Sequence, residues 1–364
     1  MVERAKGQLR SIVAQDVETE IVLPVGKGIA GAVAATGQVI DIPDAYADSR
    51  FDPQFDPILG YRTNDIYCMP IINREGVVVG VLELLNRAKP LDTDDFEFLS
   101  GVSVHVGLAV ENAWLHREMV EKRKFERELD LAREIQRNFY PNLPETYEGV
   151  EIAASSDMCE AVGGDYLDYF PQSDGRFIIM LGDVSGKGIG AALVMTSLHA
   201  TCRALIRHIH SIEKVAGILN DTLVETTGPG IFVTLMFILV DPKDHRFHYI
   251  CAGHNPPLHV DASGKAVYIE KGGGPPVGLF AHLSYSREIV EVEKGSVVVI
   301  YTDGVSEAEN SESDQFGVER LSEVVQKHRT ESAAGIHAGI RAALSEFVHG
   351  FAASDDSTMI VLKF

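Results

Sequence analysis

Residues 182–195 read Gly-Asp-Val-Ser-Gly-Lys-Gly-Ile-Gly-Ala-Ala-Leu-Val-Met, and the rest of the chain is interpreted from them. They follow an apolar run, residues 177–181, whose length is typical of a buried strand. They lead into a segment rich in small residues that is typical of a helix. This order places the carboxylate of Asp183 at a strand end, in a glycine-rich turn where backbone can approach a ligand closely.

Further aspartates share this setting, next to glycine or in an acidic pair at a predicted strand boundary. They are Asp165, Asp303 and the pair Asp355-Asp356. A single aspartate beside glycine is more often a turn or helix cap, but four such points in one domain are unlikely to arise by chance. Carboxylates gathered on strand ends, with no Lys or Arg expected beside them, repel one another unless a cation is bound. Hard oxygen ligands favour Mg²⁺ or Mn²⁺, so the sequence predicts a two-metal hydrolytic site.

The bulk composition limits the class of protein. The chain has 364 residues, of which 45% are hydrophobic, which is enough for two domains and a connector. Its net charge of -21 argues against a nucleic-acid surface and is explained by solubility or by basic protein partners. The four cysteines form no CxxC pair, and no apolar run approaches the roughly 20 residues of a membrane helix. We therefore expect a soluble cytoplasmic protein with no signal peptide, no membrane span and no nucleic-acid partner.

The first third of the chain alternates short strand patterns with a glycine cluster. Residues 11–23 predict a strand that ends at Pro24, and residues 66–72 and 77–85 predict a hairpin. Residues 26–37 predict a tight turn, a short Ala-rich helix and a glycine stop. A phosphate cradle is the alternative interpretation of this cluster.

This region resembles a GAF domain, a small-molecule-binding or purely regulatory α/β module. The matching segments are Gly26 to Gly37, Asp48-Ser49-Arg50-Phe51, Cys68-Met69-Pro70-Ile71 and Gly80-Val81-Leu82-Glu83-Leu84-Leu85-Asn86-Arg87. The resemblance implies a sensor domain over residues 1–113 that responds to a small molecule or a protein, without identifying the ligand pocket. A complete GAF domain usually has a helix and another strand before this point, so the start is expected to be incomplete or completed by a partner.

A long helix is predicted from Phe96 onward, and residues 114–144 form its charge-rich part. Apolar positions there keep steps of three and four and make a narrow stripe, typical of a coiled-coil seam. The stripe consists of Leu115, Met119, Phe125, Leu129, Ala132, Ile135 and Phe139. Pro141 and Pro144 end the helix. The helix either packs on its own domain or associates with a second copy in a parallel homodimer, which would couple the two domains mechanically.

The remaining residues, 145–364, group strands together and place helices in separate pairs, which predicts an α+β sandwich with two stacked sheets. The predicted strands are 151–157, 165–170, 177–184, 232–240, 247–252, 257–260, 266–270, 285–292, 296–301 and 357–363. The predicted helices are 190–209, 211–226, 318–328 and 333–348.

Five motifs in this part resemble PPM-type serine/threonine phosphatases of the SpoIIE/RsbU class, in the family's order. They are Gly163-Gly164-Asp165-Tyr166, Gly182-Asp183-Val184-Ser185-Gly186-Lys187-Gly188, Ala252-Gly253-His254-Asn255-Pro256, Tyr301-Thr302-Asp303-Gly304-Val305-Ser306-Glu307 and Asp355-Asp356-Ser357-Thr358. The resemblance implies an αββα sandwich of two antiparallel sheets flanked by helix pairs. A P-loop is excluded, because the spacing around Lys187 is wrong and Gly188 has no hydroxyl for Mg²⁺.

The resemblance also implies roles for individual residues. Asp183 would bridge two Mn²⁺ or Mg²⁺ ions, with the Val184 carbonyl completing one shell, and Asp165, Asp303 and Asp355 would supply further ligands. The ions would lower the pKa of a bridging water that attacks phosphorus in line. Other residues are assigned less directly: Asp356 would orient its neighbour, and Gly164, His254 and Asn255 would position phosphate or water, with turn capping the alternative for the last two.

Two functions remain open on this basis. The first is a sensor-controlled phosphatase acting on a phosphoserine or phosphothreonine of an anti-sigma-factor antagonist, in a partner-switching pathway. The second is a phosphatase-like scaffold that has lost activity and signals by binding partners. The intact aspartates favour the enzyme. We further expect that a signal at the first domain changes the packing of the linker and shifts the helices after Gly190.

Overall fold

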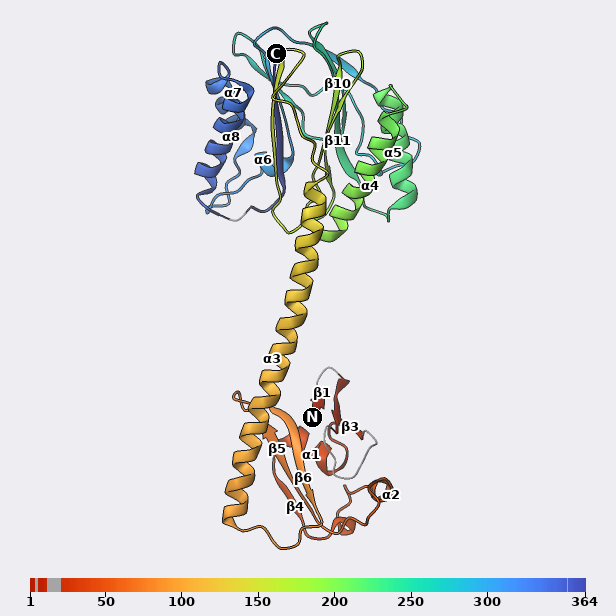
Figure 1. Ribbon diagram of the computed structural model, residues 1–364, viewed down its shortest axis with the longest axis vertical. Coiled ribbons are helices and arrows are strands. Elements are labelled where there is room, and N and C mark those ends of the chain that lie inside the picture. The colour runs from red at the N-terminus through yellow and green to blue at the C-terminus, as the bar shows by residue number, and fades with distance from the viewer. Residues whose placement is uncertain (4–5, 12–20, 352) are drawn as a thin grey trace. The chain divides into compact units, whose positions relative to one another are not determined.

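The computed structural model describes residues 1–3, 6–11, 21–351 and 353–364. The chain divides into two compact units, Met1–Phe125 and Glu126–Phe364. The boundary between them falls within one continuous helix, α3 (Thr93–Arg137), seen in Figure 1. The helix predicted from Phe96 is therefore present. Most of the strand predicted over residues 11–23 lies outside the described residues, apart from its end at Val22–Pro24.

The described residues of the first unit form two three-stranded antiparallel sheets, ordered β1-β2-β3 and β4-β5-β6. Its strands are β1 (Val2–Glu3), β2 (Gln8–Arg10), β3 (Val22–Pro24), β4 (Ile40–Ile42), β5 (Ile66–Ile72) and β6 (Val78–Leu85). Its helices are α1 (Gly28–Thr36), η2 (Ala45–Ala47), η3 (Pro53–Phe55), α2 (Asp56–Leu59) and the first part of α3. The pairing of β5 with β6 confirms the predicted hairpin.

The glycine cluster before α1 forms a tight turn. The amide of Gly26 donates a hydrogen bond to the Gly31 carbonyl at 2.9 Å, and Gly26 has a φ of 87°. A Cβ at Gly31 would lie 2.8 Å from the Pro24 carbonyl oxygen, which is too close for any side chain. Local backbone geometry thus accounts for these glycines, as expected for a tight turn.

The second unit contains two larger antiparallel sheets, ordered β15-β12-β11-β10-β9 and β14-β13-β16-β17-β8-β7. Their strands are β7 (Thr146–Tyr147), β8 (Val150–Asp157), β9 (Tyr166–Pro171), β10 (Phe177–Val184), β11 (Val233–Asp241), β12 (Arg246–Ala252), β13 (Leu258–Val260), β14 (Ala266–Tyr268), β15 (Glu288–Glu291), β16 (Val297–Tyr301) and β17 (Ser357–Lys363). The helices are α4 (Gly188–Ile206), α5 (Ile212–Thr226), α6 (Asp303–Ser306), α7 (Gly317–His328) and α8 (Ala333–Val348).

Three buried apolar clusters give this unit its layers. One lies between the sheets and includes Phe177, Ile238 and Ile360. A second joins α4 and α5 to the five-stranded sheet, and a third joins α7 and α8 to the six-stranded sheet. Figure 1 shows the two helix pairs on the outer faces of the sheets. The predicted αββα sandwich is confirmed.

Helix α4 is the one helix in the described part of the chain that is long and apolar enough to cross a membrane by length and composition. Its buried side chains recur every three or four residues and face the five-stranded sheet. They are Ala191, Met195, Leu198, Cys202 and Ile206. This spacing is that of a helix packed on a sheet. The apolar composition of α4 is thus explained by its place in the protein core.

Antiparallel pairing brings the acidic strand ends to one edge of the sandwich. Tyr166, at the start of β9, is paired with Gly182 near the end of β10. In the other sheet, Tyr301 at the end of β16 is paired with Met359 near the start of β17. Asp165, Asp183, Asp303 and Asp355 flank these strand ends. The register of four strands therefore places the predicted site.

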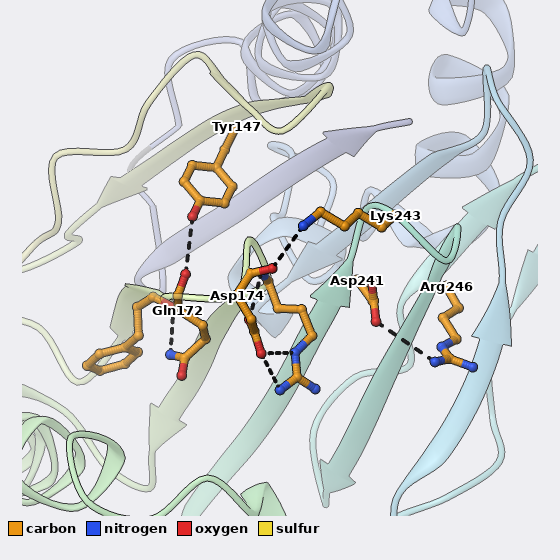
Figure 2. Close-up of polar contacts among 8 residues, drawn as sticks. Tyr147, Gln172, Asp174, Asp241, Lys243 and Arg246 are labelled. Carbon is orange, nitrogen blue, oxygen red and sulfur yellow. Dashed lines mark hydrogen bonds and ion pairs between the residues drawn. The ribbon is translucent and has the colours of Figure 1, made fainter.

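The other end of β9 and β10 carries a separate set of polar contacts (Figure 2). Asp174 accepts a hydrogen bond from Arg176 Nε at 2.9 Å, and its carbonyl accepts one from Lys243 Nζ at 3.2 Å. The Gln172 side chain donates to the Phe170 carbonyl at 3.2 Å. Gln172, Asp174 and Arg176 belong to the turn between β9 and β10. This turn lies at the ends of the two strands that are remote from Asp165 and Asp183.

Candidate metal centre

The two sheets meet at Asp165. This side chain is 1% exposed and directly precedes β9 of the five-stranded sheet. Its Oδ2 accepts a hydrogen bond of 2.9 Å from Thr302 Oγ1, which follows β16 of the six-stranded sheet. Thr302 Oγ1 also accepts the Thr358 amide at 2.9 Å, so one hydroxyl ties the three segments together.

Asp356 is buried and holds a loop in place. Its Oδ1 accepts the Cys159 amide at 2.8 Å, and its Oδ2 accepts the Gly164 amide at 2.7 Å. Two glycines allow this close packing: a Cβ at Gly163 would lie 2.4 Å from Asp356 Oδ2, and a Cβ at Gly304 would lie 2.0 Å from its carbonyl oxygen. Both carboxylate oxygens are therefore committed to backbone amides.

Gly164 and Val184 lie against each other at the end of β10. A Cβ at Gly164 would lie 3.2 Å from the Val184 carbonyl oxygen and 3.2 Å from the Ala191 side chain. Glycine at this position leaves that carbonyl uncovered from one side. Val184 itself is buried, with 1% of its side chain exposed. The role of the Val184 carbonyl as a metal ligand stays a prediction.

Repulsion between neighbouring carboxylates contributes to the raised pKa values of Asp165, Asp183 and Asp303. Burial, together with the charges of Asp303 and Asp355, raises the pKa of Asp183 to about 7. Burial also raises the pKa of Asp303, with Asp355 adding to the effect. The pKa of Asp165 is raised well above its usual range by burial and, more weakly, by Asp183. Clustered acids that resist ionisation are typical of a site that takes a cation.

Lys187 corrects one premise of the sequence interpretation, which expected no cation beside these carboxylates. Its Nζ lies 2.8 Å from Asp355 Oδ2 and donates a hydrogen bond of 2.5 Å to the Ser354 carbonyl. The ion pair raises the pKa of Lys187. The lysine belongs to the glycine-rich turn after Asp183, so its residue type was visible in the sequence, but its partner was not.

The donor set matches a divalent cation in its chemistry. It offers hard carboxylate oxygens, and the repulsion among them is relieved by positive charge. Within the described residues, however, no three His, Cys, Asp or Glu side chains are already arranged so that they could hold a metal ion. Lys187 and the Asp356 amide contact the two oxygens of Asp355, and Thr302 contacts Asp165, so these groups occupy oxygens that the predicted ligand set would offer.

His254 lies behind the site. It is 8% exposed, and its Nδ1 lies 2.9 Å from Thr234 Oγ1, which in turn reaches the Asp183 carbonyl at 3.4 Å. Burial lowers its pKa to about 4, so the ring is neutral near pH 7. Thr234 thus connects His254 to the backbone of Asp183. Asn255 follows in the same turn and is partly buried.

Several residues that hold the centre were not identified from the sequence. Thr302 stands beside Asp303, and its position next to a predicted ligand was the available signal. Tyr140 donates a hydrogen bond of 3.3 Å to the Asp165 carbonyl, and Gln136 contacts Gly163. Both lie in the predicted linker region, where nothing local distinguishes them from other polar helix residues.

Two family models match different parts of the chain. The family model described as Stage II sporulation protein E (SpoIIE) matches residues 173–364, and the GAF domain model matches residues 4–110. A cGMP-specific 3',5'-cyclic phosphodiesterase of Drosophila sechellia is 40% identical over 134 residues, which are 36% of this chain and 11% of that protein.

Solved structures of phosphatase domains are similar to part of the chain. The RsbU and RsbW domains of Rv1364c from Mycobacterium tuberculosis are 25% identical, with a TM-score of 0.52 and coverage of 60% of each chain. The SiaA-PP2C domain of Pseudomonas aeruginosa is 21% identical, with a TM-score of 0.59 and coverage of 67% of this chain and 98% of that chain. Since the SpoIIE model covers more than half of the sequence, the chain belongs to the SpoIIE family, with a PPM-type phosphatase domain preceded by a GAF domain.

Proposed function

We propose that this protein is a metal-dependent serine/threonine phosphoprotein phosphatase. The observation that carries the proposal is the convergence of acidic side chains from both sheets at one edge, where Asp183 has a pKa of about 7 through burial and neighbouring carboxylates. A cluster whose members resist ionisation in the absence of a cation is suited to binding one.

Asp165, Asp183, Asp303 and Asp355 would hold two Mn²⁺ or Mg²⁺ ions, with the Val184 carbonyl as a further oxygen ligand. When bound, the two ions supply Lewis acidity, which makes hydroxide available near neutral pH and offsets charge on the phosphoryl oxygens. Asp356 fixes the loop before Asp165 through the amides of Cys159 and Gly164. Each of the four free cysteines lies outside this set, and none is needed as a nucleophile.

The substrate we propose is a phosphoserine or phosphothreonine on an anti-sigma-factor antagonist, in a cytoplasmic partner-switching pathway. The resemblance to the SpoIIE/RsbU class supports this choice. So does the similarity to the mycobacterial protein Rv1364c, which contains both an RsbU and an RsbW domain. The negative charge of this chain is compatible with a protein partner and unfavourable for nucleic acid.

A catalytically silent scaffold is the second candidate. The ion pair between Lys187 and Asp355, together with the other contacts of the carboxylates, favours it, because each occupies an oxygen that metal binding would need. In that case the second unit would bind its phosphoprotein partner without hydrolysis.

The two candidates differ in metal-dependent turnover. We expect the full chain with Mn²⁺ to release phosphate from a phosphoserine protein, and Asp183→Asn and Asp303→Asn to lower kcat/KM by at least about 100-fold, as loss of electrostatic stabilisation does in other enzymes. Asp174→Asn is the matched control, because this aspartate lies at the remote end of β10 (Figure 2). Folded parent protein that binds the phosphoprotein but releases no phosphate would establish the scaffold instead.

We also propose that the GAF domain regulates the phosphatase through α3. The helix runs without a break from Thr93 to Arg137 and so enters both compact units. A small molecule or protein bound at the first unit would change how α3 pairs with a second copy. The change would reach α4 and α5, the two helices that come after the Asp183 turn.

A further inference from the structure

The end of α3 is hydrogen-bonded to residues 160–163, a loop of the candidate metal centre. Arg133 Nε donates to the Ala161 carbonyl at 2.8 Å, and its Nη2 donates to the Glu160 carbonyl at 3.0 Å. One turn later, Gln136 Nε2 donates to the Gly163 carbonyl at 2.6 Å. Gln136 Oε1 accepts the amide of the same glycine at 3.0 Å.

The contact between Gln136 and Gly163 is buried. Its side chain is 3% exposed, and both of its hydrogen bonds to Gly163 are buried. If the side chain were apolar, a buried N–H and a buried C=O would lose their partners, and no solvent could replace them. An amide is the side chain that satisfies a backbone donor and acceptor together.

The opposite side of the same loop is held by Asp356, through the amides of Cys159 and Gly164. The loop is therefore held between α3 and the carboxylate that precedes β17. Asp165 follows Gly164 directly, and its carboxylate is fixed by Thr302. A shift of Gly163 would therefore displace the backbone of Asp165, two residues further along the chain.

We propose that Gln136 is a positioning residue for the metal centre, acting through Gly163 on Asp165. The proposal rests on the proposed function, because it assumes that Asp165 is a metal ligand. It makes the affinity for the metal depend on where the end of α3 lies. Helix position and metal occupancy would then be linked through one buried amide.

The test is Gln136→Leu, which keeps nearly the same volume and removes both hydrogen bonds. Metal-free full-length protein is titrated with Mn²⁺ by calorimetry. We expect the Kd for Mn²⁺ to rise about 10- to 100-fold, the usual effect of removing a group that orients a ligand. Gln172→Leu is the matched control: this glutamine also donates to a backbone carbonyl, at the other end of β9, and its Kd should stay within twofold of the parent (Figure 2).

Gln136→Glu serves as the second variant, because it keeps the acceptor for the Gly163 amide and loses only the donor. Its Kd should fall between those of the parent and Gln136→Leu. In metal-free protein, the Gly163 amide should exchange hydrogen faster in Gln136→Leu than in Gln172→Leu.

Two failures can be told apart. If the parent binds Mn²⁺ and the folded Gln136 variants bind it equally well, the positioning role is wrong while the proposed function stands. If the parent binds no Mn²⁺, the proposed function itself is wrong, and the positioning role is refuted with it.

Discussion

At the scale of single residues, His254 shows how burial sets a protonation state. The ring is 8% exposed, one nitrogen contacts Thr234, and Nε2 has no hydrogen-bond partner among the described residues. Burial lowers the pKa of His254 from 6.5 to about 4. The folded protein therefore holds the neutral ring over a range in which the unfolded chain already takes up a proton.

This difference predicts a pH-dependent stability. Because the folded pKa is the lower one, the contribution of His254 is fully present above pH 6.5 and is lost as the pH falls from 6.5 towards 4. The loss amounts to about 3 kcal/mol at the rate of about 1.4 kcal/mol per pKa unit. We expect His254→Asn, which cannot be protonated, to flatten the free energy of unfolding between pH 6.5 and 4, measured by urea denaturation.

His337 offers the matched control, since burial lowers its pKa as well but it lies on α8 and contacts Ser155 at 2.9 Å. His337→Asn should leave the His254 part of the profile in place. A parent and a His254→Asn protein with the same slope over this pH range would contradict the prediction.

At the scale of elements, α4 is fixed to β9 by a partly buried ion pair. Asp168 is fully buried on β9, and Arg203 on α4 contacts both of its oxygens, at 3.0 and 2.7 Å. Burial raises the pKa of Asp168 even though Arg203 opposes the shift. His199, also on α4, lies 3.6 Å from the same carboxylate. The contact sits on the helix that follows the Asp183 turn.

Replacing one member of this pair should lower the free energy of unfolding more than replacing both. We expect Arg203→Met to lower the free energy of unfolding by about 1–3 kcal/mol, because a buried carboxylate loses its partner while some solvent still reaches the site. Arg203→Met combined with Asp168→Asn should recover part of that loss. The measurement is thermal and urea unfolding of the single and double variants. A double variant less stable than Arg203→Met alone would contradict this account.

At the scale of the whole molecule, α3 leaves apolar side chains exposed along the predicted stripe. Leu115 is 55% exposed, Met119 48%, Phe125 53% and Ile135 51%. The stripe does not continue to Phe139, which follows α3 and stacks on His199 of α4, with 4.7 Å between ring centroids. The exposed part is long enough to pair with a second copy, and a parallel homodimer remains our prediction.

The predicted dimer is tested by placing charge in the stripe. Leu115→Glu with Met119→Glu should convert a dimeric parent to a monomer, because carboxylates do not pack into a coiled-coil seam. The molar mass is measured by light scattering after gel filtration. Arg117→Ala, on the opposite face of the same helix, should leave the mass unchanged. A monomeric parent, or a double variant that stays dimeric, would refute association through this face.

Much of the fold could be predicted from local pattern. The limits of β10 and β17 match the predicted runs 177–184 and 357–363, because a buried strand bounded by glycine or aspartate leaves a clear signal. α8 likewise matches residues 333–348. Element ends were less certain where capping decides them, so α4 begins at Gly188, two residues before the predicted start.

The sequence by itself determined which residues stand at strand ends, because apolar runs, glycines and acidic residues are local features that survive without any partner. Only the tertiary structure decided what those residues touch. Thr302 and Asp165 are 137 residues apart, Lys187 and Ser354 are 167 apart, and each pair meets only when the two sheets stack. Such contacts depend on strand order and register, which no local pattern encodes. The contact of Lys187 with Asp355, and that of Gln136 with the loop before Asp165, therefore became visible only in the folded chain.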